Sequence, residues 1–131
     1  MTASTGVTVG LTVTHRRYVP YSHAHYAGNL VDGAYSLAAF GDVATEMCIR
    51  TDGDEGLFAS YADVQFRAPV RVGDVLEIEC RLVRVGRRSR EMEFELRVVT
   101  RGAATADQPS AADVLDPPII ATTARGTCVV P

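Results

Sequence analysis

The chain has 131 residues, 47% of them hydrophobic, which predicts one globular domain over residues 1–131 with a substantial core. Its formal net charge is −3 and no basic tract follows one face, so the sequence argues against a nucleic-acid partner. The first 15 residues lack the basic and continuous apolar regions of a secretory signal, and no apolar run is long enough to span a membrane. We therefore expect a soluble, cytoplasmic protein with no membrane partner.

The first predicted strand covers residues 7–13, in which alternate positions are apolar. Residues 14–27 are expected to be irregular. An apolar helix follows from Leu30 to Ile49, with its N-cap at the glycine or asparagine of positions 28–29. Glycine turn residues at 51–56 predict the end of this helix.

Four further segments have the pattern of strands, and they run over residues 57–66, 75–85, 90–99 and 119–130. In the first of these, alternation would place Phe58, Ser60, Ala62, Val64 and Phe66 on one face. The next two alternate between apolar and charged residues, as in an antiparallel sheet with one buried and one wet face. Residues 86–89 predict a hairpin turn. The polar, Ala- and Pro-rich residues 102–118 predict a long mobile loop.

This element order predicts an α+β fold with one long central helix. Because no second helix is available, the helix must fill the concave side of a curved five-stranded antiparallel sheet. The apolar edge or face that remains uncovered predicts a homodimer or a higher homo-oligomer.

Polar residues gather just before and at the start of the apolar helix. Two histidines, a tyrosine, an asparagine and Asp32 lie between His23 and Gly33. Since burying an unpaired charge is very costly, we expect Asp32 to face a cleft, where it could act as an acid or base. Equally open is a role limited to complementing the positive end of the helix dipole. For His23 and His25, loop hydrogen bonding is as open as catalysis.

Metal and redox chemistry are not predicted. The three cysteines are widely spaced and form no CxxC motif. His23 and His25 form a His-x-His pair without an evident third ligand, so no metal is expected.

The element order resembles the hotdog fold, and two motifs carry the resemblance. His23 precedes Asp32 by nine residues, and Asp32 ends a Leu-Val-Asp triplet. Many hotdog thioesterases carry His-Gly-Gly and then, nine residues after the His, an Asp in a similar context on the central helix. Residues 64–74, VQFRAPVRVGD, are similar to the family pattern Phe-x-x-Pro-Val-x-x-Gly-Asp. The resemblance therefore implies a five-stranded antiparallel sheet wrapped around one long helix.

A narrower resemblance covers residues 25–46, HYAGNLVDGAYSLAAFGDVATE. They are similar to the 3-aminoacyl-CoA ammonia lyase branch, which includes relatives from secondary metabolism that add glycine to a 2-enoyl thioester and then hydrolyse it. The resemblance implies an enzyme that adds an amine such as glycine at carbon 3 of a 2-enoyl thioester by conjugate (Michael) addition, or eliminates ammonia in reverse. Thioester hydrolysis to a 3-amino acid would accompany this chemistry. Alternatives are a plain acyl-CoA or acyl-carrier-protein thioesterase and a non-catalytic acyl-binding protein.

The resemblance also implies roles for individual residues. Asp32 would be the catalytic carboxylate, with His25 or His23 as a further base. Backbone N–H groups around Ala24 and His25 would donate to the thioester oxygen. The predicted substrate-binding residues are Ala24, Tyr21, Tyr26, Asn29, Arg16 and Arg17, and either arginine could hold the carboxylate of an amino acid.

The family's Gly-Gly pair is replaced here by Ala24-His25, which argues against simple hydrolysis as the main task and leaves room for a polar reactant. We expect no bound cofactor. The predicted partners are an acyl group carried as a thioester on coenzyme A or on the phosphopantetheine of an acyl carrier protein, and an amino acid or ammonia.

Overall fold

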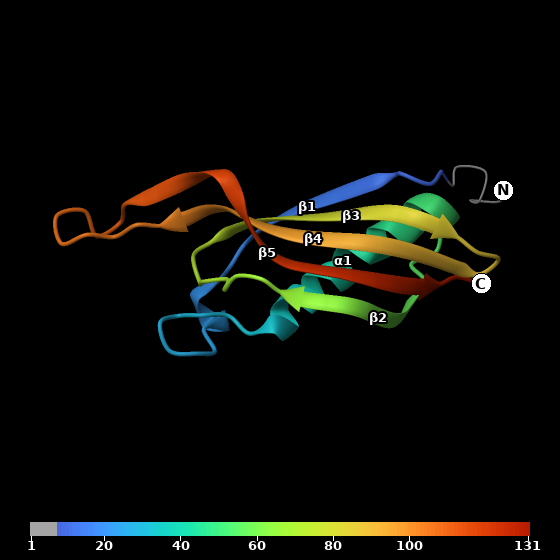
Figure 1. The fold of residues 1–131 in the computed structure, drawn as a ribbon, viewed down its shortest axis with the longest axis horizontal. Helices are drawn as coiled ribbons and strands as arrows, with labels where there is room; N and C mark the ends of the chain where they lie inside the picture. The colour runs from blue at the N-terminus through green and yellow to red at the C-terminus, as the bar shows by residue number, and fades with distance from the viewer. Residues whose placement is uncertain (1–7) are drawn as a thin grey trace.

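The computed structural model describes residues 8–131, which form five strands and one long helix (Figure 1). In chain order the elements are β1 (Thr12–Tyr18), a short 3-10 helix η2 (Tyr21–His23), α1 (Gly33–Asp52), β2 (Leu57–Phe66), β3 (Val75–Val85), β4 (Ser89–Gly102) and β5 (Ala112–Val129). The strands form one antiparallel sheet in the order β1–β3–β4–β5–β2, and α1 packs across its inner face. The predicted five-stranded sheet with a single long helix is confirmed.

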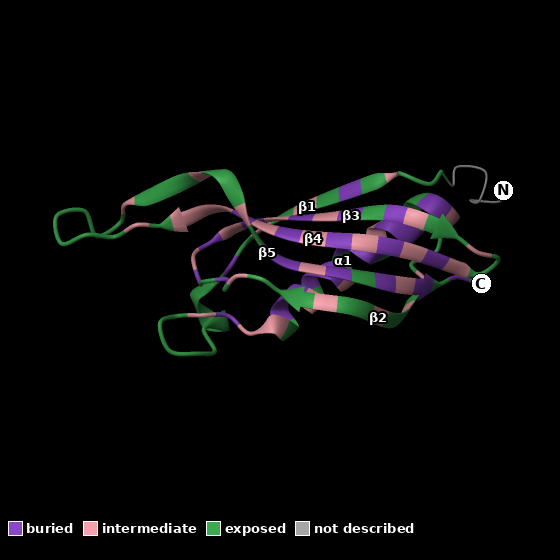
Figure 2. Cartoon of the chain, in the orientation of Figure 1, coloured by how far each residue is buried: buried purple, intermediate pink, exposed green. Residues whose placement is uncertain are grey.

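The core lies between α1 and the inner face of the sheet (Figure 2). Phe40, Val43 and Met47 recur every three or four residues on α1 and are fully buried. From the sheet, Leu76 and Phe94 meet this helix face, and the Phe40 and Phe94 rings stack with centroids 4.9 Å apart. Burying side chains of this size stabilises the fold by about 1.5–3 kcal/mol each, so this interface fixes the position of α1.

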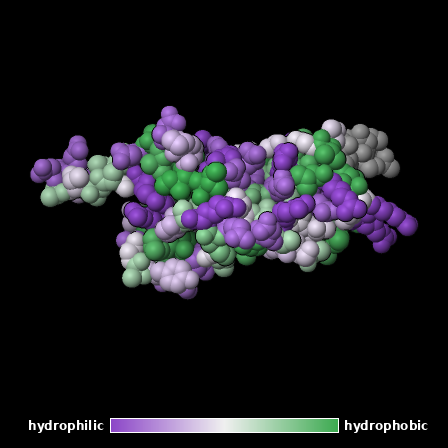
Figure 3. Space-filling model, viewed as in Figure 1, coloured by the Kyte–Doolittle hydropathy of each residue, from purple (hydrophilic) through white to green (hydrophobic). Residues whose placement is uncertain are grey.

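The opposite face of the sheet is polar. Alternate residues of β3 and β4 are charged on this side, and Figure 3 shows hydrophilic side chains spread along it. The predicted alternation of these two strands is therefore confirmed. None of the helices within residues 8–131 is long and apolar enough to cross a membrane.

The first strand lies later than predicted. β1 occupies residues 12–18, whereas Gly10 lies in a turn with φ of 98°, and position 7 is outside the described residues. Every residue of β1 pairs with β3, from Thr12 opposite Arg81 to Tyr18 opposite Val75. β1 is an edge strand, and one of its sides is open to solvent. It can therefore accommodate the charged residues at 15–17, although residues 14–27 are predicted to be irregular.

The helix begins at Gly33, three residues later than predicted, and the predicted N-cap at positions 28–29 is wrong. Gly28 and Asn29 both have positive φ values, 76° and 60°, and form a turn. The residues that follow are not helical, because the Val31 N–H pairs with a distant segment and donates to the Val70 carbonyl at 2.9 Å. The helix runs to Asp52, three residues beyond the predicted Ile49, and the predicted glycine stop within 51–56 is confirmed, since Gly53 adopts the left-handed conformation just after the last helical residue.

β2 has the predicted bounds, but two register irregularities break its alternation. Phe58, Tyr61 and Val64 pack against the core, whereas Ser60 and Phe66 are exposed. The predicted single face for this strand is therefore wrong. A bulge adds one residue to one strand, so the side chains after the bulge point to the opposite face of the sheet from the one that alternation predicts.

The predicted loop at 102–118 is shorter in the structure, where only residues 103–111 lie outside the strands. β4 continues to Gly102 and β5 starts at Ala112, and these two residues pair. The ends of the two strands form a hairpin arm that projects from the body of the molecule (Figure 1) and is largely exposed (Figure 2). A ribbon exposed on both faces needs no apolar alternation, so its sequence resembles a loop.

Candidate active site

A cavity of about 420 Å³ opens at the start of α1. In Figure 1 the start of α1 lies on the side of the helix away from the C-terminus of the chain. The walls of the cavity come from the loop before α1, the first turn of α1, the end of β2 with the turn that follows, and β5. The residues that matter chemically are Tyr26, Asp32, Gly33, Ser36, Phe66, Arg67 and Thr122.

Backbone pairing positions the loop that carries Asp32. The Val72 N–H donates to the Asn29 carbonyl at 3.0 Å, and the Val31 N–H donates to the Val70 carbonyl at 2.9 Å. The second sequence motif, residues 64–74, therefore supports the first. Asp32 follows directly as the N-cap residue of α1, half-buried, and its side chain makes no capping hydrogen bond. The carboxylate thus lines the cavity without being committed to the helix end.

The start of α1 also brings a backbone donor to the cavity. The first N–H groups of a helix have no acceptor within it and lie at the positive end of its dipole. Among the hydrogen bonds of residues 8–131, none is donated by the Gly33 N–H. A Cβ at Gly33 would lie 2.5 Å from Cε1 of Phe66, so glycine lets this ring pack against the helix start. An N–H beside a carboxylate suits a substrate whose carbonyl oxygen gains charge during reaction.

Of the predicted catalytic residues, only Asp32 lines the cavity. His23 and His25 lie in the exposed loop before α1. The His23 ring meets the Tyr35 ring edge-on with centroids 4.8 Å apart, and the His25 ring meets Tyr26 at 4.6 Å. Asp32 and Tyr26 therefore both line the cavity, whereas the two histidines lie outside its wall.

The predicted oxyanion donors are already used. The Ala24 N–H donates to the Tyr21 carbonyl at 3.2 Å and the His25 N–H donates to the Leu30 carbonyl at 2.9 Å. Neither N–H is free for a thioester oxygen, contrary to the prediction. The Ala24 N–H closes the short helix η2 and the His25 N–H closes the loop that follows it, and residue types alone do not reveal these local pairings.

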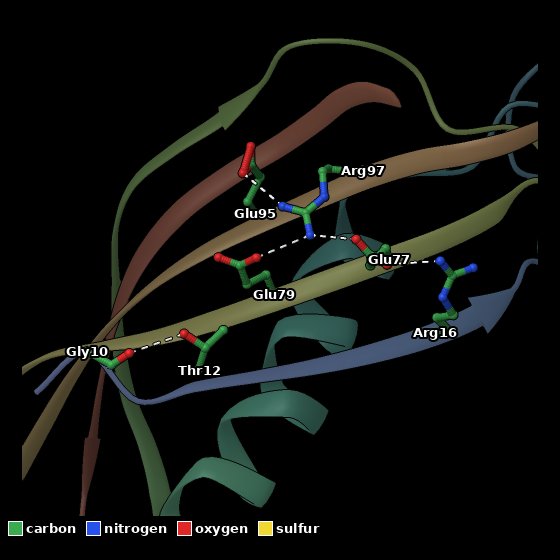
Figure 4. Close-up of polar contacts among 7 residues, drawn as sticks. All are labelled: Gly10, Thr12, Arg16, Glu77, Glu79, Glu95 and Arg97. Carbon is green, nitrogen blue, oxygen red and sulfur yellow. Dashed lines mark hydrogen bonds and ion pairs between the residues drawn. The ribbon is translucent and has the colours of Figure 1, made fainter. Parts of the chain in front are cut away.

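The predicted substrate-binding arginines lie on β1, outside the cavity wall. Figure 4 shows Arg16 pointing toward Glu77, at 3.0 Å, on the outer side of the sheet. Arg97 also binds Glu77, at 2.7 Å, and its hydrogen bond is the main reason that the pKa of Glu77 is lowered. Arg17 pairs with Asp42 and lies over the Tyr35 ring.

The remaining predicted binding residues have structural settings of their own. Asn29 is a turn residue, and Tyr21 is exposed with its hydroxyl near Gly73. Arg67 is the arginine that lines the cavity, and its Nε donates to the Thr123 hydroxyl at 3.1 Å. Sequence reasoning did not single out Arg67, although it lies within the second motif. Within residues 8–131, no cluster of three His, Cys, Asp or Glu side chains is arranged to hold a metal ion.

Comparison with known proteins agrees with this architecture. Residues 28–104 match the Thioesterase superfamily. The chain is 54% identical over 110 residues to 3-aminobutyryl-CoA ammonia lyase of Acetoanaerobium sticklandii, covering 82% of this chain and 85% of that protein. It superposes on beta-alanyl-CoA:ammonia lyase from Clostridium propionicum with a TM-score of 0.88 and 38% identity, over 94% of this chain and 87% of that one.

A more distant structure shows the fold alone. Cj0915 of Campylobacter jejuni, a hexameric hotdog fold thioesterase, is 22% identical with a TM-score of 0.70, over 88% of this chain and 79% of that one. The sheet wrapped around α1 is the hotdog fold, with a cavity lined by a carboxylate and a helix N-terminus. The chain belongs to the Thioesterase superfamily and is an enzyme of that superfamily.

Proposed function

We propose that this enzyme adds ammonia reversibly to carbon 3 of a 2-enoyl-CoA thioester, so that elimination of ammonia from a 3-aminoacyl-CoA is the reverse reaction. The observation that carries the proposal is the uncommitted carboxylate of Asp32 beside the unpaired Gly33 N–H in one cavity. The 54% identity to an ammonia lyase that acts on a CoA thioester supports the choice of reaction.

The chemistry follows from those two groups. In the elimination direction, the Asp32 carboxylate takes a proton from carbon 2, and the electron pair moves onto the thioester oxygen. That oxygen accepts a hydrogen bond from the Gly33 N–H, which stabilises the enolate charge. The substrate carries its amine as an ammonium group, so the enolate expels neutral ammonia as the bond between carbon 3 and nitrogen breaks. Ammonia takes the proton held by Asp32 and leaves as ammonium.

Addition runs through the same steps in reverse. Asp32 takes a proton from ammonium, the neutral ammonia attacks carbon 3, and protonated Asp32 delivers its proton to carbon 2. One carboxylate therefore serves as base and acid, and the enzyme is regenerated after each turnover. His25 or His23 as an additional base remains a prediction.

Other features of the proposed reaction rest on the sequence resemblance. Glycine as the amine, an acyl carrier protein as the carrier and hydrolysis of the product remain predictions, as do amino-acid binding by Arg16 or Arg17 and substrate contacts of Tyr21, Ala24 and Asn29. A homo-oligomer is also proposed. It is supported by the edge strand β2, where Leu57 and Phe66 are 75% and 58% exposed.

The test is incubation with crotonyl-CoA and ammonium chloride, followed by mass analysis of the thioesters and a thiol assay for free coenzyme A. We expect 3-aminobutyryl-CoA to form. Butyryl-CoA is the matched control, because it lacks the double bond and should give no adduct. Release of coenzyme A from both thioesters at similar rates, with no amine adduct, would favour a plain thioesterase and overturn the proposal.

A further inference from the structure

Two buried hydroxyl groups line the cavity one helical turn below Asp32. Ser36 lies on α1 and Thr122 on β5, and their residues are 3% and 1% exposed. The Thr122 hydroxyl donates to the Ser36 Oγ at 3.1 Å. Buried hydroxyls are costly unless they are hydrogen-bonded, and this mutual bond satisfies only part of what the two hydroxyls can form.

The pair retains hydrogen-bonding capacity. Two hydroxyls offer two O–H donors and four lone pairs, of which their mutual bond uses one donor and one lone pair. Another hydroxyl of α1 bonds back to a helix carbonyl, that of Thr45 to Gly41 at 2.9 Å. Among the hydrogen bonds of residues 8–131, Ser36 makes no such bond. Lone pairs of both hydroxyls are therefore available to a group in the cavity.

The depth of the pair matches the position of the nitrogen on carbon 3. From Gly33 to Ser36 the helix rises about 4.5 Å. In an extended 3-aminoacyl thioester, the carbonyl oxygen and the nitrogen on carbon 3 are up to about 4 Å apart from ordinary bond lengths and angles. A thioester oxygen on the Gly33 N–H therefore places that nitrogen at the level of Ser36.

We infer that Ser36 and Thr122, together with the Asp32 carboxylate, form the subsite that binds the amine nitrogen. Three acceptors satisfy the three N–H bonds of ammonia and leave its lone pair directed at carbon 3. This inference rests on the proposed function and names the residues that receive its second substrate. The competing explanation is that the hydroxyl bond only ties α1 to β5.

Separate KM values distinguish these explanations, because addition uses two substrates. Ser36→Ala and Thr122→Val each remove one acceptor and keep the shape of the cavity. We expect each to raise the KM for ammonia roughly 5- to 10-fold, as for loss of one hydrogen bond, with little change in the KM for crotonyl-CoA. Thr122→Ser retains the hydroxyl and should stay close to the parent enzyme. Thr127→Val, on the outer side of the same strand, is the matched control and should change neither constant.

An unchanged KM for ammonia in a folded Ser36→Ala protein would overturn the inference, as would equal rises in both KM values, which indicate a distorted cavity. If Thr122→Val does not fold, Ser36→Ala decides by the same criteria. Absence of any ammonia adduct with the parent enzyme is a different result, because it overturns the proposed function and the subsite with it.

Discussion

Asp74 anchors the turn that supports the active-site loop. It is fully buried and accepts hydrogen bonds from the Arg71 N–H at 2.8 Å and from Arg101 at 3.0 and 2.8 Å. Arg101 also donates to the Pro69 carbonyl at 2.9 Å, so the pair connects the base of the arm to the wall of the cavity. Asp74→Asn keeps the size of the side chain, but it removes the charge and places an NH₂ group where only acceptors fit.

The size of the effect follows from burial. Breaking a buried ion pair costs about 3–5 kcal/mol, because the remaining charge has no partner. The entropy of unfolding is about 2.1 cal/mol/K per residue, or about 0.28 kcal/mol/K for this chain, so the Tm should fall by roughly 11–18 °C.

Thermal unfolding followed by circular dichroism measures this shift. Asp113→Asn is the matched control, because Asp113 is exposed on the arm and its loss should shift the Tm by less than about 2 °C. If Asp74→Asn lowers the Tm no more than this control does, the anchoring role of Asp74 is refuted.

Two further predictions concern the cavity wall and the far end of α1. Gly33→Ala should force the Phe66 ring off the helix start and raise the KM for crotonyl-CoA several-fold in a folded protein, and steady-state kinetics with an unchanged KM would contradict this. Asp52→Asn should lower the free energy of unfolding at pH 7, because Asp52 pairs with buried Arg90 at 2.7 Å. Burial raises the pKa of Asp52, but hydrogen bonds from Arg90 and Thr51 lower it further, to below its usual value. The pair therefore stabilises the fold above about pH 4, and this contribution is lost as the pH falls through the lowered pKa. Urea unfolding should show the gap between the parent and Asp52→Asn closing in acid, and a gap that is constant with pH would contradict the argument.

Much of the fold could be predicted because burial leaves a local pattern. β3 and β4 alternate between apolar and charged residues since one face packs on α1 and the other meets solvent. The arm leaves no such pattern, because both of its faces are exposed. The start of α1 could not be placed either, since the pairing of Val31 with Val70 joins segments distant in the sequence.

The residues of the candidate site likewise include some that the sequence predicts and some that only the folded structure reveals. Asp32 stood out as a carboxylate at the start of an apolar helix, and the structure places it in the cavity wall. Ser36 and Thr122 are ordinary small polar residues in their own segments. They lie 86 residues apart, and only the packing of α1 against β5 brings their hydroxyls together. The free N–H of Gly33 was missed because the loop donors of Ala24 and His25 could be recognised as occupied only from the backbone geometry.

The central claim is that Asp32 moves the proton at carbon 2 during addition of ammonia. The most direct measurement is kcat for formation of 3-aminobutyryl-CoA from crotonyl-CoA and ammonium, compared between the parent enzyme and Asp32→Asn. We expect Asp32→Asn to keep its Tm and to lose kcat by roughly 10²–10⁴-fold, as for loss of a general base. Near-normal turnover in Asp32→Asn with an unchanged Tm would contradict the account and transfer the role to His25 or His23.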